Sequence, residues 1–122
     1  MPPKMNLIMD LLQFYKCLAD DTRLKSLLLI LRENELCVCE LTHALEQSQP
    51  KVSRHLALLR QKKLVIDRRQ GQWVHYQINP NIPDWAQEIL SLTLANNLNS
   101  IQQEVQRLSS MTCRPNREVL CD

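Results

Sequence analysis

The sequence predicts a mainly α-helical domain with a β-hairpin wing, that is, a winged helix-turn-helix. Gly71 is the only glycine, whereas leucine, glutamine and alanine, which favour helices, are frequent. Two β-rich runs flank Gly71 and directly follow a segment with the start and turn signals of two short helices. The 122 residues suffice for one small domain, which a second copy of the chain would help to stabilise.

Apolar residues at helical spacing predict a first helix over residues 5–18. Asp20 or Asp21 can cap a second helix that runs to about Arg32, because a short acidic side chain accepts hydrogen bonds from free backbone N–H groups. Residues 33–34 interrupt the pattern, and we expect a short third helix over residues 38–45.

A fourth helix is predicted to start at Ser48-Gln49-Pro50, since Ser48 can cap it and Pro50 fits a first turn, where no backbone N–H is needed. This helix runs to about Gln61 and buries an apolar stripe formed by Val52, Leu56 and Leu59. The connection over residues 46–48 joins the two short helices into a helix-turn-helix.

Residues 64–69 and 73–78 are predicted to form the two strands of a hairpin. Gly71 lies at its tip, where glycine supplies a positive φ at low cost. A hairpin directly after a helix-turn-helix is a wing.

A long last helix is predicted over residues 85–111, after Pro80 and Pro83. Its apolar residues follow the 4-3-4-3 spacing of helix-on-helix packing: Leu94, Leu98, Ile101, Val105 and Leu108. We expect this stripe to form a homodimer together with the first helix, because the helix is longer than a small core can cover; the alternative is that it covers the domain's own core. Residues 1–111 then form the DNA-binding and dimerisation domain, and residues 112–122 a mobile tail.

Positive charge is concentrated in residues 48–79, which hold seven basic residues and one acidic residue, against eight basic and twelve acidic residues elsewhere. Such a segment favours a polyanion partner, here double-stranded DNA. Arginine and glutamine can form hydrogen bonds with base edges, and lysine and serine can bind phosphates or bases. His55 lies nearer the buried stripe of the fourth helix, so it is as suited to a structural role as to a DNA contact. The candidate DNA-contacting residues are Gln49, Lys51, Ser53, Arg54 and His55 on the helix and Arg68, Arg69 and Gln72 in the wing. A two-fold dimer predicts an operator with inverted half-sites about one helical turn, or a multiple of it, apart.

Cys37 and Cys39 are separated by one residue at the expected start of the third helix. Thiolates bind soft ions, and a helix N-terminus favours the thiolate form. In an α-helix, residues i and i+2 lie about 200° apart around the axis, so both thiols face one ion only where the backbone is extended or unwinds. We therefore expect ligand binding to distort this third helix and to move the fourth helix, the recognition helix that carries the candidate DNA-contacting residues.

Five cysteines, an odd number, argue against a complete disulfide framework and favour a reducing, cytoplasmic location. No export signal or membrane-spanning segment is expected. An enzyme is not expected either, because the chain has no glycine-rich phosphate loop and no plausible Ser/His/Asp set.

Four motifs together resemble the ArsR/SmtB family of metal-sensing repressors, and most closely its arsenite-responsive members. They are Leu-Ala-Asp-Asp-Thr-Arg-Leu at residues 18–24, Glu-Leu-Cys-Val-Cys-Glu-Leu at 35–41, Ser-Gln-Pro-Lys-Val-Ser-Arg-His-Leu at 48–56 and Gly-Gln-Trp-Val-His-Tyr at 71–76. The resemblance covers about residues 5–110. It implies a winged-helix homodimer that binds a palindromic operator and releases it when arsenite or antimonite, with no organic cofactor, binds Cys37 and Cys39.

The chain departs from that family at Thr42, where arsenite-responsive members usually carry a third cysteine. Candidates for the third ligand are Cys17, Cys113, Cys121, or an external thiol or hydroxide. The resemblance also makes a zinc site on the last helix unexpected, because its predicted span holds no histidine and only two acids, Glu88 and Glu104. Two other functions stay open: a thiol redox sensor of the same fold, using Cys37 and Cys39 or Cys113 and Cys121, and a DNA- or partner-binding protein with inert cysteines.

Overall fold

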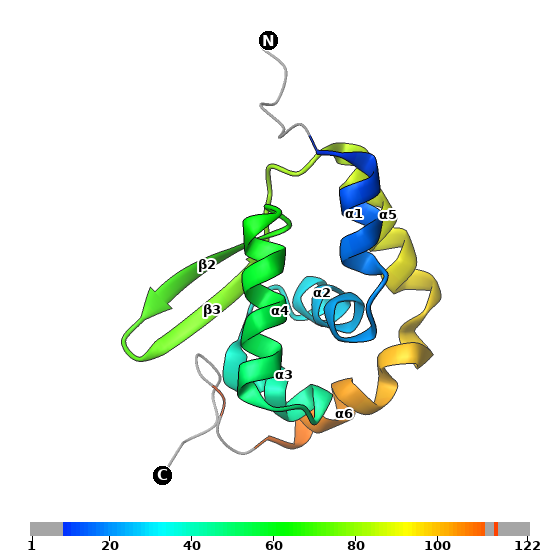
Figure 1. Cartoon of the computed structure of the whole chain (residues 1–122). Helices are drawn as coiled ribbons and strands as arrows, with labels where there is room; N and C mark the ends of the chain where they lie inside the picture. Colours follow the sequence, from blue (N-terminus) through cyan, green and yellow to red (C-terminus); the bar gives the residue numbers. More distant parts are fainter. Residues whose placement is uncertain (1–8, 112–113, 115–122) are drawn as a thin grey trace.

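The computed structural model describes residues 9–111 and Arg114, and the fold is the predicted mainly α-helical winged helix-turn-helix (Figure 1). In chain order the elements are α1 (Leu11–Leu18), α2 (Asp21–Glu33), β1 (Leu36–Cys37), α3 (Val38–Leu45), α4 (Gln49–Gln61), β2 (Val65–Gln70), β3 (Trp73–Ile78), α5 (Asp84–Asn96), the 3₁₀ turn η1 (Leu98–Ile101) and α6 (Gln102–Ser110). The three strands form one antiparallel sheet in the order β1-β3-β2.

Short acidic side chains set the starts of the first two helices. Asp10 is extended and accepts a 2.9 Å hydrogen bond from Gln13 N–H, so α1 starts after it. The predicted start at residue 5 is therefore wrong for residues 9 and 10, and residues 5–8 lie outside the described part of the chain. Asp20 caps α2 through a 3.0 Å bond from Arg23 N–H, and Asn34, with a φ of 76°, ends it.

The helix-turn-helix is confirmed. Ser48 accepts a hydrogen bond from Lys51 N–H at 3.3 Å and caps α4, and the helix has a proline in its first turn. Glu46, with a φ of 53°, ends α3. The Thr22 hydroxyl donates to the side-chain oxygen of Gln47 at 2.8 Å, and this bond ties the turn to α2.

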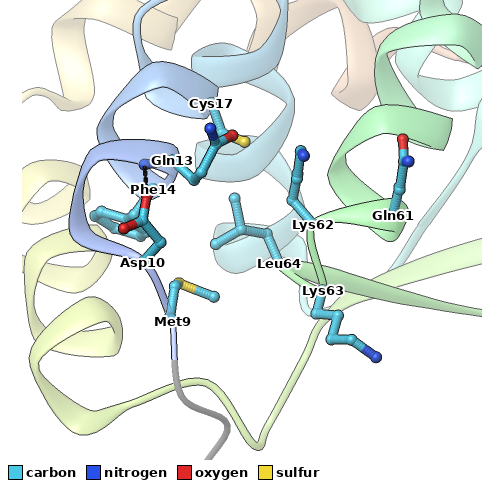
Figure 2. Close-up of a pocket in the computed structure, with 9 residues that line it drawn as sticks. All are labelled: Met9, Asp10, Gln13, Phe14, Cys17, Gln61, Lys62, Lys63 and Leu64. Carbon is cyan, nitrogen blue, oxygen red and sulfur yellow. Dashed lines mark hydrogen bonds between the residues drawn. The ribbon is translucent and has the colours of Figure 1, made fainter.

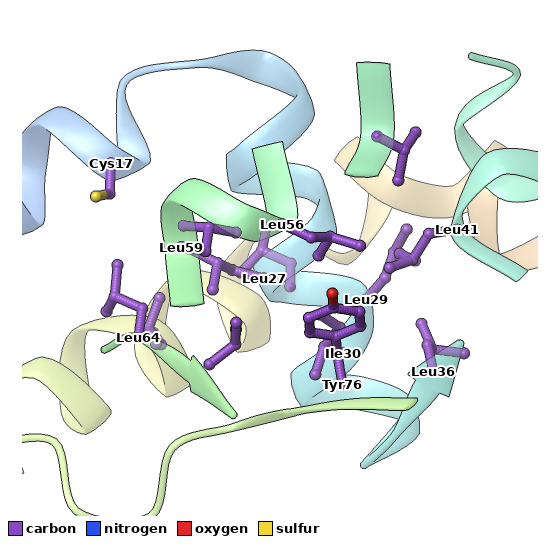
Figure 3. Packing of buried hydrophobic residues seen from close by; sticks show 14 of the residues in the cluster. Cys17, Leu27, Leu29, Ile30, Leu36, Leu41, Leu56, Leu59, Leu64 and Tyr76 are labelled. Carbon is purple, nitrogen blue, oxygen red and sulfur yellow. The ribbon is translucent and has the colours of Figure 1, made fainter. Parts of the chain in front are cut away.

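The core surrounds α2, whose residues 27–30 are all buried. Figure 3 shows Leu27, Leu29 and Ile30 in this core. Leu36 from β1, Leu41 from α3, Leu56 and Leu59 from α4 and Tyr76 from β3 pack against these residues. α3, α4 and the sheet share this core. A shift of the segment around Cys37 would therefore displace side chains that also pack against the recognition helix α4.

The hairpin of β2 and β3 projects from the helical body as a wing (Figure 1). Gln70 pairs with Trp73 across the tip, and Gly71 has a φ of 60° there, as predicted. The sequence did not predict β1, which has only two residues and pairs with the far strand β3. A strand of this length carries no periodic pattern.

The prediction of one long last helix over residues 85–111 is wrong. The helix ends at Asn96, and the segment consists of α5, η1 and α6. The side-chain amides of Asn96 and Asn97 donate at 2.9 Å to the carbonyls of Leu92 and Thr93, one turn back. Asparagine side chains that bond to the backbone compete with helical hydrogen bonds, and residues 96–100 hold three asparagines and a serine.

The apolar stripe that was predicted to form the dimer contact is therefore divided between the core and the surface. Ile101 and Leu108 are buried in the domain's own core, whereas Leu98 is exposed. The described surface still presents large apolar side chains on the first helix and the last segment: Leu11, Leu12, Tyr15, Leu92 and Leu98. Within the described residues, no helix combines the length and the apolar character needed to cross a bilayer.

Candidate functional site

The recognition helix α4 divides its residues between the core and the solvent. Val52, Leu56 and Leu59 have no exposed surface and hold the helix against α2. Of the predicted DNA-contacting residues, Gln49, Lys51 and Arg54 are exposed on this helix, and Ser53 is half-buried.

His55 is placed differently from the other four helix candidates. Its side chain is 14% exposed, and Arg23 on α2 donates to its Nδ1 atom at 3.2 Å. Burial lowers the pKa of His55, and the charge of Arg23 lowers it further against the opposing effect of Asp20. Arg23 also donates to the Cys17 carbonyl at 2.9 Å, so this contact joins the recognition helix to the α1–α2 junction.

The wing exposes Arg68, Arg69 and Gln72. Arg68 is already engaged, because its guanidinium donates to both oxygens of Glu35, at 2.7 and 2.5 Å. This hydrogen bond holds the pKa of Glu35 below its usual value. The chain just before Cys37 is thereby fastened to the wing.

The two sulfurs of Cys37 and Cys39 meet, and the structure joins them as a disulfide with the Cα atoms 5.5 Å apart. Cys37 has a φ of −89° and a ψ of 167°, so it is extended and lies outside the first turn of α3. The predicted helix distortion on ligand binding is therefore not needed to bring the thiols together. Of the two backbone states that the sequence left open for this pair, extended or unwound, Cys37 has the extended one.

The segment around the thiols is held by a buried carboxylate. Glu40 is 1% exposed, and its Oε1 accepts a 3.0 Å hydrogen bond from Cys37 N–H, which caps α3. Thr42, at the position where a third cysteine was missing, donates its hydroxyl to the Cys39 carbonyl at 2.9 Å. Among the described residues, no group of three or more His, Cys, Asp or Glu side chains is arranged to hold a metal ion.

One rung of the sheet links the thiol site to the wing. Cys37 lies opposite His75 on β3, and His75 lies opposite Arg68 on β2. Directly opposed residues of antiparallel strands have side chains on the same face. His75 is buried, with Nδ1 3.8 Å from Glu35, and its Nε2 atom has no hydrogen-bond partner among the residues that the structure describes.

Cys17 is remote from the pair. Figure 3 shows it at the opposite end of the core from Leu36, the neighbour of Cys37. It lines a pocket of about 200 Å³ between α1 and the end of α4, together with Phe14 and Leu64 (Figure 2). Burial raises the pKa of the Cys17 thiol, which disfavours the thiolate. Cys113 and Cys121 lie outside the described residues.

Sequence reasoning missed three residues around the thiol site: Glu35, Glu40 and Arg114. Arg114 donates to Glu40 Oε2 at 2.6 Å, although 74 positions separate the two residues. Of these three, only Glu40 could have been found from the sequence. A glutamate at the third position of a helix can accept a hydrogen bond from the backbone N–H of the residue just before the helix.

Comparison with known proteins identifies the family. Residues 20–67 match the model of the bacterial regulatory protein, arsR family. The chain is 52% identical over 107 residues to the arsenic resistance transcriptional regulator ArsR1 of Pseudomonas putida, covering 88% of this chain and 84% of that protein. The chain belongs to the ArsR family. It is accordingly a DNA-binding transcriptional regulator and not an enzyme.

Two other comparisons agree with this ArsR-family assignment. The arsenical resistance operon repressor of Escherichia coli is 46% identical over 110 residues, covering 90% of this chain and 94% of that protein. The crystal structure of AntR, described as an antimony-specific transcriptional repressor, superposes with a TM-score of 0.60 at 30% identity, covering 75% of this chain and 79% of that chain.

Proposed function

We propose that the protein is a cytoplasmic repressor that releases its operator when trivalent arsenic or antimony binds Cys37 and Cys39. The observation that carries this proposal is the meeting of the two sulfurs at the start of α3, the helix before the recognition helix. The names of its relatives support arsenic or antimony as the inducer class.

In this proposal α4 enters the major groove of the operator. Gln49, Lys51 and Arg54 face the solvent there and can reach base edges or phosphates, while Ser53 is partly covered. The exposed Arg69 and Gln72 side chains of the wing are proposed to contact the phosphate backbone beside that groove. His55 contributes mainly by fixing α4 against α2 through Arg23.

The active form is proposed to be a homodimer on an inverted repeat. The exposed apolar residues Leu11, Leu12 and Tyr15 on α1 and Leu92 on α5 belong to the first and last parts of the chain, where the dimer contact was predicted. α1 and α5 touch through the edge-to-face pair Phe14–Trp85, with ring centroids 5.1 Å apart, so these two helices can present one shared surface to a second copy.

Release is proposed to travel from the thiols through the sheet as well as through α3. A ligand on reduced Cys37 and Cys39 replaces two S–H groups, and each bond to arsenite forms with loss of one water. Cys37 shares a rung with His75 and Arg68, and Glu35 clamps Arg68. A change in the Cys37 backbone therefore alters the wing without unwinding α3.

The residues present supply two of the three donors that trivalent arsenic prefers. Thr42 cannot be a third thiolate, and its hydroxyl already bonds to the Cys39 carbonyl. Cys17 is held at the far end of the core. We propose that the third donor is Cys113, Cys121, or an external thiol or hydroxide, and Cys113→Ser and Cys121→Ser variants distinguish these sources by their arsenite affinity.

A redox sensor is the second candidate, because Cys37 and Cys39 are bonded to each other in the structure. A peroxide would oxidise the two thiols to the disulfide and take up their two electrons and two protons. Hydrogen peroxide would thereby become water, and an organic hydroperoxide would become an alcohol and water. The disulfide form has no thiolate left for arsenite. Arsenite binding and oxidation therefore compete for the same two sulfurs.

Fluorescence anisotropy of reduced protein on DNA from upstream of its own gene tests the proposal. Arsenite is expected to release the DNA, while zinc, as the control metal, leaves it bound. Release by peroxide but not by arsenite would favour the redox sensor. Tight binding that no thiophile or oxidant changes would leave a DNA-binding protein with inert cysteines.

A further inference from the structure

Arg114, which follows α6, fastens the chain to the thiol site. The Arg114 side chain is 11% exposed and donates from Nε to Glu40 at 2.6 Å, from Nη2 to Glu33 at 3.2 Å and from Nη1 to the Leu108 carbonyl at 3.3 Å. One guanidinium thus joins the end of α2, the start of α3 and the end of α6.

Arg114 reaches the thiol pair through Glu40. A carboxylate that is 1% exposed is costly unless cations and hydrogen-bond donors compensate its charge. Arg114 binds Oε2, and Cys37 N–H binds Oε1 of the same carboxylate. The position of this carboxylate therefore sets the backbone of Cys37, one of the two residues whose sulfurs must converge.

The opposite end of α3 has a comparable clamp. Arg107 on α6 donates to the Ala44 carbonyl at 2.8 Å and pairs with Glu46 at 2.5 Å. Both arginines tie the C-terminal part of the chain to α3, but only Arg114 acts on the turn that carries the thiols. Arg107 thus offers a matched control, because it contacts the other end of the same helix, α3.

We propose that Arg114 is a positioning residue for the thiol site, which holds Glu40 and, through it, the Cys37 backbone in the geometry that brings the two sulfurs together. This inference rests on the function proposed above. Partners that orient a ligand residue change metal affinity by about 10-fold to 100-fold when they are removed. Lysine keeps the charge but cannot reproduce the planar fork, so Arg114→Lys should restore the function only in part.

The test compares full-length Arg114→Gln and Arg107→Gln proteins with the unaltered chain in the arsenite titration of DNA-bound protein. Arg114→Gln is expected to raise the arsenite concentration for half-release by about 10-fold or more, and Arg107→Gln by less than about 2-fold. The DNA affinity without arsenite is measured for each protein and used to normalise the titration.

Alkylation of the reduced proteins by iodoacetamide, mapped by peptide mass, supplies a second readout that needs no arsenite. Arg114→Gln should speed the alkylation of Cys37 without changing that of Cys17, which is equally buried but lies at the other end of the core. General loosening of the fold would speed both cysteines and would overturn the proposal.

A double-mutant cycle with Glu40→Gln completes the design. If Arg114 acts through Glu40, the double variant should resemble the single Glu40→Gln variant in half-release concentration. Equal shifts for Arg107→Gln and Arg114→Gln, or additive effects in the cycle, would overturn the proposal. If arsenite fails to release even the unaltered protein, the proposed function fails, and the alkylation rates still decide the role of Arg114.

Discussion

At the scale of single residues, the long-range partners of a side chain determine its role. Arg68 was predicted from the sequence to contact DNA, and for His55, near the buried stripe of its helix, a DNA contact and a structural role were equal alternatives. In the structure Arg68 donates a hydrogen bond to Glu35, 33 positions away, and His55 accepts one from Arg23, 32 positions away. Partners at such separations leave no local pattern, so the sequence could not predict these two contacts.

His55 gives a pH prediction. Its folded-state pKa lies below the ordinary 6.5, so the unfolded chain takes up the proton first as the pH falls. The free energy of unfolding should therefore decrease as the pH falls below about 6.5. His55→Gln keeps an acceptor for Arg23 without titrating, and it should show a weaker decrease in urea unfolding at about pH 7.5 and about pH 5.5. An identical pH dependence in both proteins would refute this assignment.

At the scale of elements, local signals placed most of the fold. Ser48 caps the helix that it was predicted to cap, Asp20 rather than the alternative Asp21 caps α2, and Gly71 occupies the turn of the wing. The prediction failed in the segment after α5, where apolar spacing suggested one helix but Asn96 and Asn97 bind the preceding turn. It also missed β1, because a two-residue strand is defined by its distant partner in β3.

The wing offers an internal comparison of two adjacent arginines. Arg69 has an exposed side chain, whereas Arg68 is paired with the Glu35 carboxylate. Arg69→Gln should reduce the slope of log affinity against log salt by about 1 per wing, because one phosphate contact is lost. Arg68→Gln should reduce it by clearly less. Anisotropy titrations over a range of salt concentrations measure both slopes, and equal reductions would mean that Arg68 leaves Glu35 to bind DNA.

At the scale of the whole molecule, the exposed apolar side chains predict how two copies associate. Leu12 is 60% exposed, so a charge at this position does not disturb the core of one copy. Leu12→Glu should convert a dimer into a folded monomer, measured by sedimentation velocity and circular dichroism, and should weaken operator binding. Ile66→Glu, at a 39% exposed position on the wing, is the control that should remain dimeric. Dissociation of both variants, or of neither, would place the contact elsewhere.

The same scale connects the thiol site to DNA binding. Cys37 is joined to the wing through His75 and to the C-terminal segment through Glu40 and Arg114. The sequence predicted the two cysteines as a site but not these connections. They depend on the order of strands in the sheet and on the return of the chain to α3 after α6.

The measurement that tests the central claim most directly is the arsenite titration of reduced Cys37→Ser, Cys39→Ser and Cys17→Ser proteins bound to operator DNA. Each of the first two variants should bind the DNA normally and fail to release it, because a single thiolate of the pair cannot chelate. Cys17→Ser should be released like the unaltered protein. Release of Cys37→Ser or Cys39→Ser at unchanged arsenite concentrations would contradict the assignment of this pair as the sensor.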